Sequence, residues 1–343
     1  MKKRSTSEDP PPRANLAMVA ARAGVSPATV SRILNGSAKV SEAKCKAVQD
    51  AIADLGFRPD PSARGLAGGR TMSVGVLTQF IDSPFYGEAL RGIEDVLQEH
   101  HYVPLFASGH WSDPDEQARI ELLIERKVDG LIILTGRLSN QTLIETAQKI
   151  PVVVTGRYLV ANNLFSIDFD NEGGCRLAVR HLVALGHQKI AFISGPADHP
   201  DAQQRLAGYR AELRARGISP DDQLLGQGDF QEAGGKQAMN AVLRRGAAFS
   251  AVIAANDQMA YGARLALHIA GLRVPEDVSL VGFDDLPHSA FTLPPLTTVR
   301  QPVYDIGKLA AQAALRLLSG ETPDTALIEA HLVTRESTRI ARH

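Results

Sequence analysis

The sequence predicts a small all-α domain followed by a larger α/β body built from two doubly wound parallel-sheet lobes. Three short helical patterns occupy residues 16–56, and a segment rich in proline and glycine follows them. From Met72 onward, short β-branched runs alternate with amphipathic helical stretches, which is typical of parallel sheets covered by helices on both faces.

The composition is that of a folded chain large enough for two or three domains, with 343 residues of which 44% are hydrophobic. No apolar run reaches the roughly 18 residues of a membrane span. The N-terminal "MKKRSTSEDPPPR" has no apolar signal core, so we expect a cytoplasmic protein without a membrane partner. Cys45 and Cys175 imply no disulfide framework and are expected to pack as small, at least partly buried residues.

Charge is distributed unevenly along the chain. Residues 1–71 hold twelve basic and six acidic side chains, whereas the remainder holds 25 basic and 32 acidic ones. A basic head on an acidic body indicates that only the head meets a polyanion.

The head divides into a disordered arm over 1–13, a helical domain over 14–60 and a linker over 61–71. Ser26 before Pro27 is a helix-start signal, Ser41 is expected to cap the third helix, and Gly56 is expected to end it in a left-handed conformation. The buried faces form three groups: Leu16, Val19, Ala20 and Ala23; Val30, Ile33 and Leu34; Val48, Ile52 and Leu55.

Two of these helices, joined by "AGVS", form the helix-turn-helix unit that places its second helix in the DNA major groove. Arg32 points outward and can pair with O6 and N7 of a guanine. The outward set also contains Pro27, Ala28, Ser31 and Asn35, and the side chains suited to phosphate contacts are Thr29, Ser31 and Asn35.

From "NLAMVAARAGVSPATVSRILNG" to "SARGLAGGRT", the head resembles the DNA-binding domain of the LacI/GalR family of bacterial transcription factors. The resemblance implies that Pro27, Ala28 and Arg32 lie at base-reading positions and that Asn35 and Lys39 contact the DNA backbone. It also implies that 61–71 is a hinge that becomes helical on the operator, with Leu66 as a minor-groove wedge. Pro27 and Ala28 have no side-chain hydrogen bonds to offer, which leaves Arg32 as the main reader.

In the body, seven runs predict strands: 73–78, 103–106, 129–134, 151–155, 189–194, 251–255 and 278–283. Helical segments are predicted near 87–100, 114–127, 140–149, 172–185, 203–216, 232–245 and 257–270. So many units exceed one open sheet, which favours two lobes with a ligand cleft at the carboxyl ends of their strands.

The resemblance continues through blocks such as "SPFYGEALRGIEDVL", "AANDQMAYGARLAL" and "VPEDVSLVGFDD" into the family's effector domain, which is similar to periplasmic sugar-binding proteins. It implies an effector-binding and dimerisation domain over 72–343, with lobe 1 at about 72–168 and 300–324 and lobe 2 at about 169–299 and 325–340. The expected effector contacts are Phe85, Tyr86, Arg157, Arg205, Phe230, Asn256, Asp284 and Gln301.

These residue types suit a sugar, since aromatic faces pack on C–H surfaces and the polar side chains pair with hydroxyls. Gly156 stands where relatives often carry an acidic residue, which suggests a more positive pocket and a larger or acidic sugar. Trp111, the only tryptophan, either edges the cleft or lies exposed in its loop.

No P-loop, nucleophile elbow or zinc-protease motif occurs, and the histidines lack partners at metal-ligand spacing, so we expect neither catalysis nor a metal or cofactor. The expected function is a repressor of carbohydrate genes that binds a palindromic operator as a homodimer, bound to the nucleoid, under control of a sugar-like effector. We also expect no coiled-coil tetramer, because no leucine-heptad helix follows the last block. A purine or nucleoside effector, a partner protein as effector, and a transport-type solute-binding protein are the alternatives.

Overall fold

The computed structural model describes residues 14–34, 40–57, 70–323 and 328–342. The chain divides into two compact units, Met1–Ser73 and Val74–His343, and we describe each by itself. The N-terminal arm and most of the predicted hinge, including Leu66, lie outside the described residues, as do Asn35 and Lys39.

The N-terminal unit consists of α1 (Leu16–Arg22), α2 (Pro27–Leu34) and α3 (Glu42–Leu55). Their predicted apolar faces meet in one core around Val19, Val30 and Val48, none of which is exposed to solvent. Gly56 ends α3 with φ of 58°, the predicted left-handed conformation. Ser41 stands at the predicted N-cap position, but its side chain makes no capping hydrogen bond.

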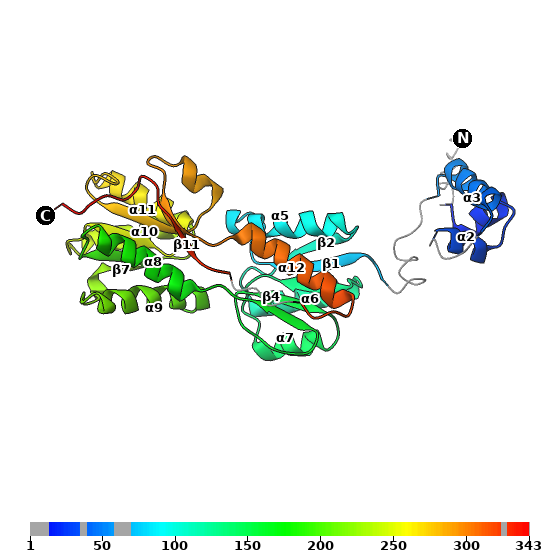
Figure 1. Cartoon of the computed structure of the whole chain (residues 1–343), viewed down its shortest axis with the longest axis horizontal. Helices are drawn as coiled ribbons and strands as arrows, with labels where there is room; N and C mark the ends of the chain where they lie inside the picture. Colours follow the sequence, from blue (N-terminus) through cyan, green and yellow to red (C-terminus); the bar gives the residue numbers. More distant parts are fainter. Residues whose placement is uncertain (1–13, 35–39, 58–69, 324–327, 343) are drawn as a thin grey trace, which may run out of the picture. The chain divides into compact units, whose positions relative to one another are not determined.

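Lobe 1 of the body is a five-stranded sheet in the order β2-β1-β3-β4-β5, with helices packed against both of its faces (Figure 1). Its elements are β1 (Ser73–Thr78), α5 (Pro84–Glu99), β2 (Val103–Ser108), α6 (Asp113–Glu125), β3 (Gly130–Ile133), α7 (Asn140–Ala147), β4 (Val152–Thr155), β5 (Leu164–Ile167) and α12 (Val303–Leu318). Ile132 packs in the cluster that holds α5 and α12, whereas Leu131 and Ile133 pack in that of α6 and α7. Alternate residues of a buried strand thus serve opposite faces, so the sheet is doubly wound.

Lobe 2 is a six-stranded sheet in the order β11-β10-β9-β8-β6-β7, parallel except for the β10–β11 pair. Its elements are α8 (Asn171–Ala184), β6 (Ile190–Ser194), α9 (Pro200–Ala215), η1 (Asp222–Leu224), β7 (Leu225–Gln227), α10 (Glu232–Arg244), β8 (Ala251–Ala254), α11 (Asp257–Ile269), β9 (Ser279–Asp284), η2 (Pro287–Phe291), β10 (Thr297–Arg300) and β11 (His331–Val333). Figure 1 shows α8 and α9 on one face of this sheet and α10 and α11 on the other.

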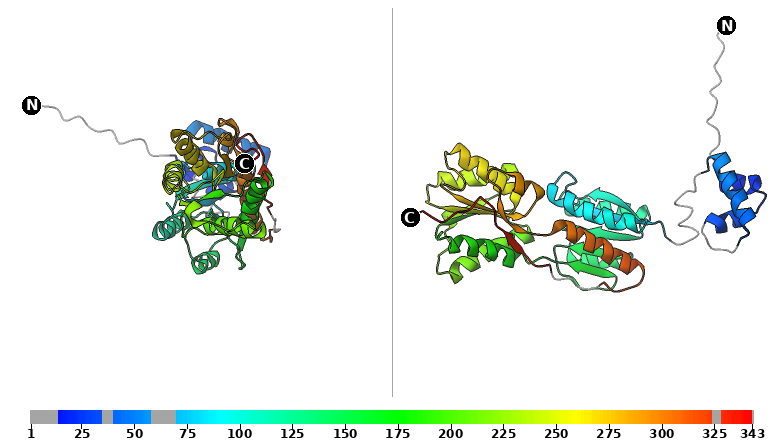
Figure 2. Two further views of the ribbon diagram at one scale, coloured as in Figure 1. Left: turned by 90° about the vertical axis from the view of Figure 1, so that its left-hand side faces the viewer. Right: turned by 45° about the horizontal axis from the view of Figure 1, so that its top comes forward.

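The chain passes between the lobes after β5, between β10 and α12, and again before β11, so each lobe is built from separated stretches of sequence (Figure 2). All seven predicted strand runs form strands. Four further strands, β5, β7, β10 and β11, were not predicted, because each spans only three or four residues and several carry polar side chains. None of the helices in the described ranges has the length and hydrophobicity of a membrane span.

Candidate effector cleft and DNA-contacting helix

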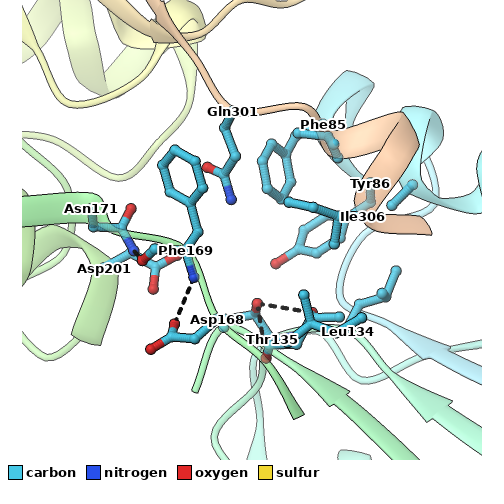
Figure 3. A pocket seen from close by; sticks show the side chains of 15 residues that line it. Phe85, Tyr86, Leu134, Thr135, Asp168, Phe169, Asn171, Asp201, Gln301 and Ile306 are labelled. Atoms are coloured by element: carbon cyan, nitrogen blue, oxygen red, sulfur yellow. Dashed lines mark hydrogen bonds between the residues drawn. The ribbon is translucent and has the colours of Figure 1, made fainter. Parts of the chain in front are cut away.

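Two adjoining cavities of about 170 and 30 Å³ lie between the lobes, on the side where the parallel strands end. They share four lining residues, Phe85, Tyr86, Thr135 and Asp201. Figure 3 shows the smaller cavity, with Phe85 and Tyr86 on one side and Asp168, Asn171 and Asp201 on the other. Of the eight predicted effector residues, seven line one or both cavities: Phe85, Tyr86, Arg205, Phe230, Asn256, Asp284 and Gln301.

Arg205, on α9, is the central cation of the cleft, and its side chain is only 3% exposed. Its Nε donates to Asn171 Oδ1 at 2.8 Å, its Nη2 donates to Gln301 Oε1 at 3.2 Å, and its Nη1 donates to the Ala255 carbonyl. The guanidinium carbon lies 3.9 Å from the ring centroid of Phe283, a cation–π distance. Most of its donors are therefore already used by the protein.

Two buried carboxyl groups flank this arginine. Asp284, at the end of β9, lies 3.5 Å from Arg205 Nη1, and Asp201, at the start of α9, lies 4.0 Å from Nη2. Burial raises the pKa of both carboxyl groups, although the arginine charge opposes the shift. Oδ1 of Asp201 is buried and has no hydrogen-bond partner among the residues that the structure describes, so it is an acceptor available to a ligand.

Aromatic rings wall the larger cavity. Trp111, in the loop after β2, stacks on His199 at the start of α9 with centroids 4.1 Å apart and planes at 4°. His199 in turn packs edge-to-face with Phe230, with centroids 4.9 Å apart. Phe85 and Tyr86 form an edge-to-face pair at 5.3 Å on the lobe 1 side. Such ring surfaces fit the C–H faces of a sugar.

Asn256 contributes mainly by holding the wall in place. Its Oδ1 accepts from the Met259 N–H at 2.9 Å and caps α11, while its Nδ2 donates to the Phe230 carbonyl at 2.9 Å. Because both polar atoms are engaged, Asn256 positions Phe230 in the cavity wall.

Arg157, the remaining predicted effector residue, does not line either cavity. Gly156, with φ of 75°, turns the chain after β4, and the guanidinium of Arg157 then donates to the carbonyls of Gly136 and Leu138. The side chain satisfies backbone groups of the loop after β3, which no sequence pattern indicated.

The expectation of a more positive pocket is wrong. The carboxyl groups that line the cavities number four, those of Asp168, Asp201, Asp229 and Asp284. One arginine, Arg205, stands among the described lining residues. Burial, with the charge of Arg205, lowers the pKa of His199 to about 3, so its ring is neutral. This balance of charge does not favour an acidic ligand.

Sequence reasoning missed His199 and Asp201 and left Trp111 undecided. The signal for the first two was weak, because "DHPD" reads as an ordinary helix start with proline at its first turn. Their approach to Trp111 depends on how the lobes meet, which no local pattern encodes.

The N-terminal unit presents α2 as its candidate DNA-contacting helix. Val30 faces the core, while Pro27, Ala28 and Arg32 are exposed. Arg32 Nε donates to the Ala28 carbonyl at 3.2 Å, a hydrogen bond on the exposed surface of α2. Of the remaining predicted contacts, Thr29 and Ser31 are half-buried, and the Thr29 hydroxyl bonds that of Ser26 at 2.9 Å.

Comparison with known proteins gives the family. The model of bacterial regulatory proteins of the lacI family matches residues 15–60, and that of a periplasmic binding protein-like domain matches 179–338. The HTH-type transcriptional regulator GalR of Escherichia coli (strain K12) is 37% identical over 300 residues, or 87% of this chain and 88% of that protein. The chain belongs to the lacI family. It is a DNA-binding transcriptional regulator with an effector-binding domain.

Other relatives of this lacI-family chain agree with that assignment. The HTH-type transcriptional repressor CytR of Escherichia coli (strain K12) is 35% identical over 324 residues, 94% of this chain and 95% of that one. The lac repressor dimer bound to operator and the anti-inducer ONPF has a TM-score of 0.85 at 32% identity, covering 95% of this chain and 99% of that one. A complex of the transcriptional regulator CelR with cellobiose has a TM-score of 0.70 at 36% identity, covering 95% and 100%.

Proposed function

We propose that this lacI-family regulator represses carbohydrate-utilisation genes by binding a palindromic operator as a homodimer, with a small sugar or sugar derivative in the cleft as its effector. The observation that carries the proposal is the interlobe cavity, in which aromatic walls surround buried carboxyl groups and one arginine. That combination suits a ligand with C–H faces and several hydroxyl donors.

The free hydrogen-bonding groups of the cleft support a neutral or donor-rich ligand. Arg205 is engaged by Asn171, Gln301 and Ala255, whereas one carboxyl oxygen of Asp201 has no partner in the described part of the chain. Sugar hydroxyls can donate to such carboxyl oxygens. Two solved relatives support the same class, since the transcriptional regulator CelR forms a complex with cellobiose and the Lac repressor is bound to ONPG.

On the DNA side, we propose that residues 14–60 bind DNA, with α2 in the major groove and Arg32 as the main base reader. Pro27 and Ala28 would contact base edges through their apolar surfaces, while Thr29 and Ser31 would contact phosphates. By the family resemblance, Asn35, Lys39 and the 61–71 hinge with Leu66 complete this surface. A single helix-turn-helix reads one half-site, which is why a dimer is needed for a palindrome.

Residues 72–343 would bind the effector and dimerise. Effector binding then changes the arrangement of the lobes and thereby the spacing of the hinges. Effector and operator affinities are coupled reciprocally, typically by about 1–3 kcal/mol. We further propose that the protein acts by binding alone, without catalysis, and works in the bacterial cytoplasm on nucleoid DNA.

The test is a thermal-shift panel of neutral sugars, glycosides, sugar acids and purines on the full-length protein. A ligand at a hundred times its Kd stabilises the folded state by about 2.7 kcal/mol, which is readily measured. We expect stabilisation by one neutral carbohydrate class, together with altered affinity for operator DNA. Stabilisation by purines alone would replace the sugar with a nucleobase ligand, and no stabilisation by any compound would contradict a small-molecule effector of these classes and favour a partner protein.

The oligomeric state is tested separately by analytical ultracentrifugation. We expect a dimer, and a stable monomer or tetramer at micromolar concentration would contradict the proposed assembly.

A further inference from the structure

Two contacts join the lobes at one mouth of the cleft. Trp111 of lobe 1 stacks on His199 of lobe 2, and beside them Arg137 of lobe 1 forms an ion pair with Asp198 of lobe 2. Asp198 and His199 are neighbours in sequence. The lobe 1 partners come from two loops, those after β2 and β3.

Two fully buried polar side chains hold those lobe 1 loops together. Gln79 accepts from the Trp111 N–H at 2.7 Å and donates to the Thr135 carbonyl at 2.9 Å, so it ties one loop to the other. Glu116 accepts from the backbone N–H of Arg137 at 2.9 Å, and its pKa is raised by burial despite that bond. The loops that carry Trp111 and Arg137 are thereby positioned as one unit.

On lobe 2, the ring of His199 is fixed by the helix that it begins. Its Nδ1 accepts from the Asp201 N–H at 3.2 Å, which caps α9 and requires the neutral ring with its proton on Nε2. The ring also makes an edge-to-face contact with Phe230, with centroids 4.9 Å apart. Trp111 stacks on a face of this ring.

The two contacts form an inner and an outer layer. Trp111 and His199 line the larger cavity, and His199 is only 7% exposed. Arg137 and Asp198 are 40% and 58% exposed, so they lie on the solvent side. Given an effector in this cleft, as proposed above, we propose that Trp111 and His199 form a lid over it, latched from outside by Arg137 and Asp198.

Two unpaired polar atoms show how an effector would act on the lid. Trp111 Nε1, on lobe 1, and Asp201 Oδ1, on lobe 2, are buried without a hydrogen-bond partner among the described residues. When the lid is shut without a ligand, both buried groups stay without a hydrogen bond, and this raises the free energy of the shut state. A ligand hydroxyl can accept from the indole N–H and donate to the carboxyl oxygen. An effector that supplies such hydroxyls bridges the lobes and stabilises the shut lid.

The sole tryptophan makes the lid directly measurable. Trp111 is the chain's only tryptophan, so acrylamide quenching of its emission in the full-length protein reports exposure of the lid. His199→Asn keeps a capping acceptor and removes the ring, and Arg137→Gln removes the outer ion pair. Loss of the ring contact should raise the open-to-shut ratio about 2- to 10-fold, seen as stronger quenching.

The matched control is Arg273→Gln, which removes a surface ion pair with Asp277 away from the cleft. Its quenching should equal that of the wild type. If His199→Asn and Arg137→Gln also match the wild type, the lid is refuted, whatever the effector proves to be.

A second experiment tests the effector's contacts, with cellobiose and D-galactose as probes. Where a probe stabilises the wild type in the thermal-shift assay, it should reduce acrylamide quenching. Trp111→Phe, which keeps a stacking ring but lacks the N–H, should bind it about 2- to 10-fold more weakly in calorimetry. A probe that binds with unchanged quenching and equal affinity for Trp111→Phe overturns this inference and leaves the proposed function standing. If neither sugar binds, the sugar effector loses support, while the ligand-free quenching still decides the lid.

Discussion

Nε of Arg205 lies 2.8 Å from Oδ1 of Asn171, and this bond ties the cleft's central cation to the first residue of α8. The same guanidinium reaches Gln301, which lies between β10 and α12. Both partners stand at points where the chain passes between the lobes. A ligand that displaces Arg205 would therefore break hydrogen bonds to Asn171 and Gln301, which stand at two of the points where the chain crosses between the lobes.

Replacing this cation is expected to destabilise the body strongly. Arg205→Met leaves Asp201 and Asp284 buried without their cation, and breaking such a buried pair costs about 3–5 kcal/mol. The free energy of unfolding in urea checks this. Arg210→Met is the control, because its pair with Asp222 is exposed and should contribute less than about 1 kcal/mol. Equal stability of the two variants would contradict the role of Arg205.

Arg32→Ala is expected to remove base preference and leave non-specific DNA binding largely intact. A bidentate arginine–guanine pair contributes about 1–3 kcal/mol of discrimination, whereas phosphate contacts contribute none. The operator is first obtained by selection from a random library, and fluorescence anisotropy at fixed salt then compares it with single-base variants. Arg22→Gln, which removes an exposed ion pair between Arg22 on α1 and Asp54 on α3, should keep the wild-type preference. An unchanged base preference in Arg32→Ala would refute the assignment.

Gly92→Ala should destabilise lobe 1. A Cβ at Gly92 in α5 would stand 2.1 Å from the Tyr304 carbonyl oxygen in α12, so the two helices would have to separate. Overpacking of this kind costs about 1–3 kcal/mol. Gly87→Ala, in the same helix, meets no atom within 4 Å and should be neutral or stabilising by up to about 1 kcal/mol. Urea unfolding of both variants distinguishes packing from helix propensity, and a neutral Gly92→Ala would show that the helices can move apart.

Acid should weaken the fold through His199. The folded protein holds its pKa at about 3, mainly by burial and then by the charge of Arg205, with Asp198 opposing and Arg137 adding to the shift. The pKa of a histidine in the unfolded chain is about 6.5. Below that pH the unfolded chain therefore binds a proton at this residue, whereas the folded chain does not. Stability contributed by the neutral ring is complete above about pH 6.5 and is lost as pH falls toward 3.

Between pH 7 and 5 this loss amounts to roughly 2 kcal/mol. His199→Asn does not titrate, so urea unfolding at both values should show the wild type losing about that much more than the variant. Burial also lowers the pKa of His181 and His187, but those residues are common to both proteins and their effect cancels. Parallel pH dependence in the two proteins would contradict the assigned environment of His199.

The local chemistry of the sequence determined most of the secondary structure. Proline after Ser26, the left-handed Gly56 and the β-branched runs act over a few residues, so their patterns predicted α2, the end of α3 and the main strands. Strand β10 was missed because "TTVR" has no apolar pattern of its own, and it becomes a strand by pairing with β9. Cleft residues were predictable where they stand at the carboxyl end of a strand, as Asp284 does at the end of β9. Parallel strands have their carboxyl ends at the same edge of the sheet, so these residues lie together.

Only the tertiary structure decided the rest of the site. Arg157 does not line the cleft, because its guanidinium donates to the carbonyls of Gly136 and Leu138. These carbonyls belong to the loop after β3, and their position depends on the fold of that loop. Trp111 stacks on His199 because the two lobes pack against each other, which brings together residues that are 88 positions apart in the sequence. Hydrogen-bond satisfaction and interlobe packing depend on the whole fold, so no local pattern of residues encodes them.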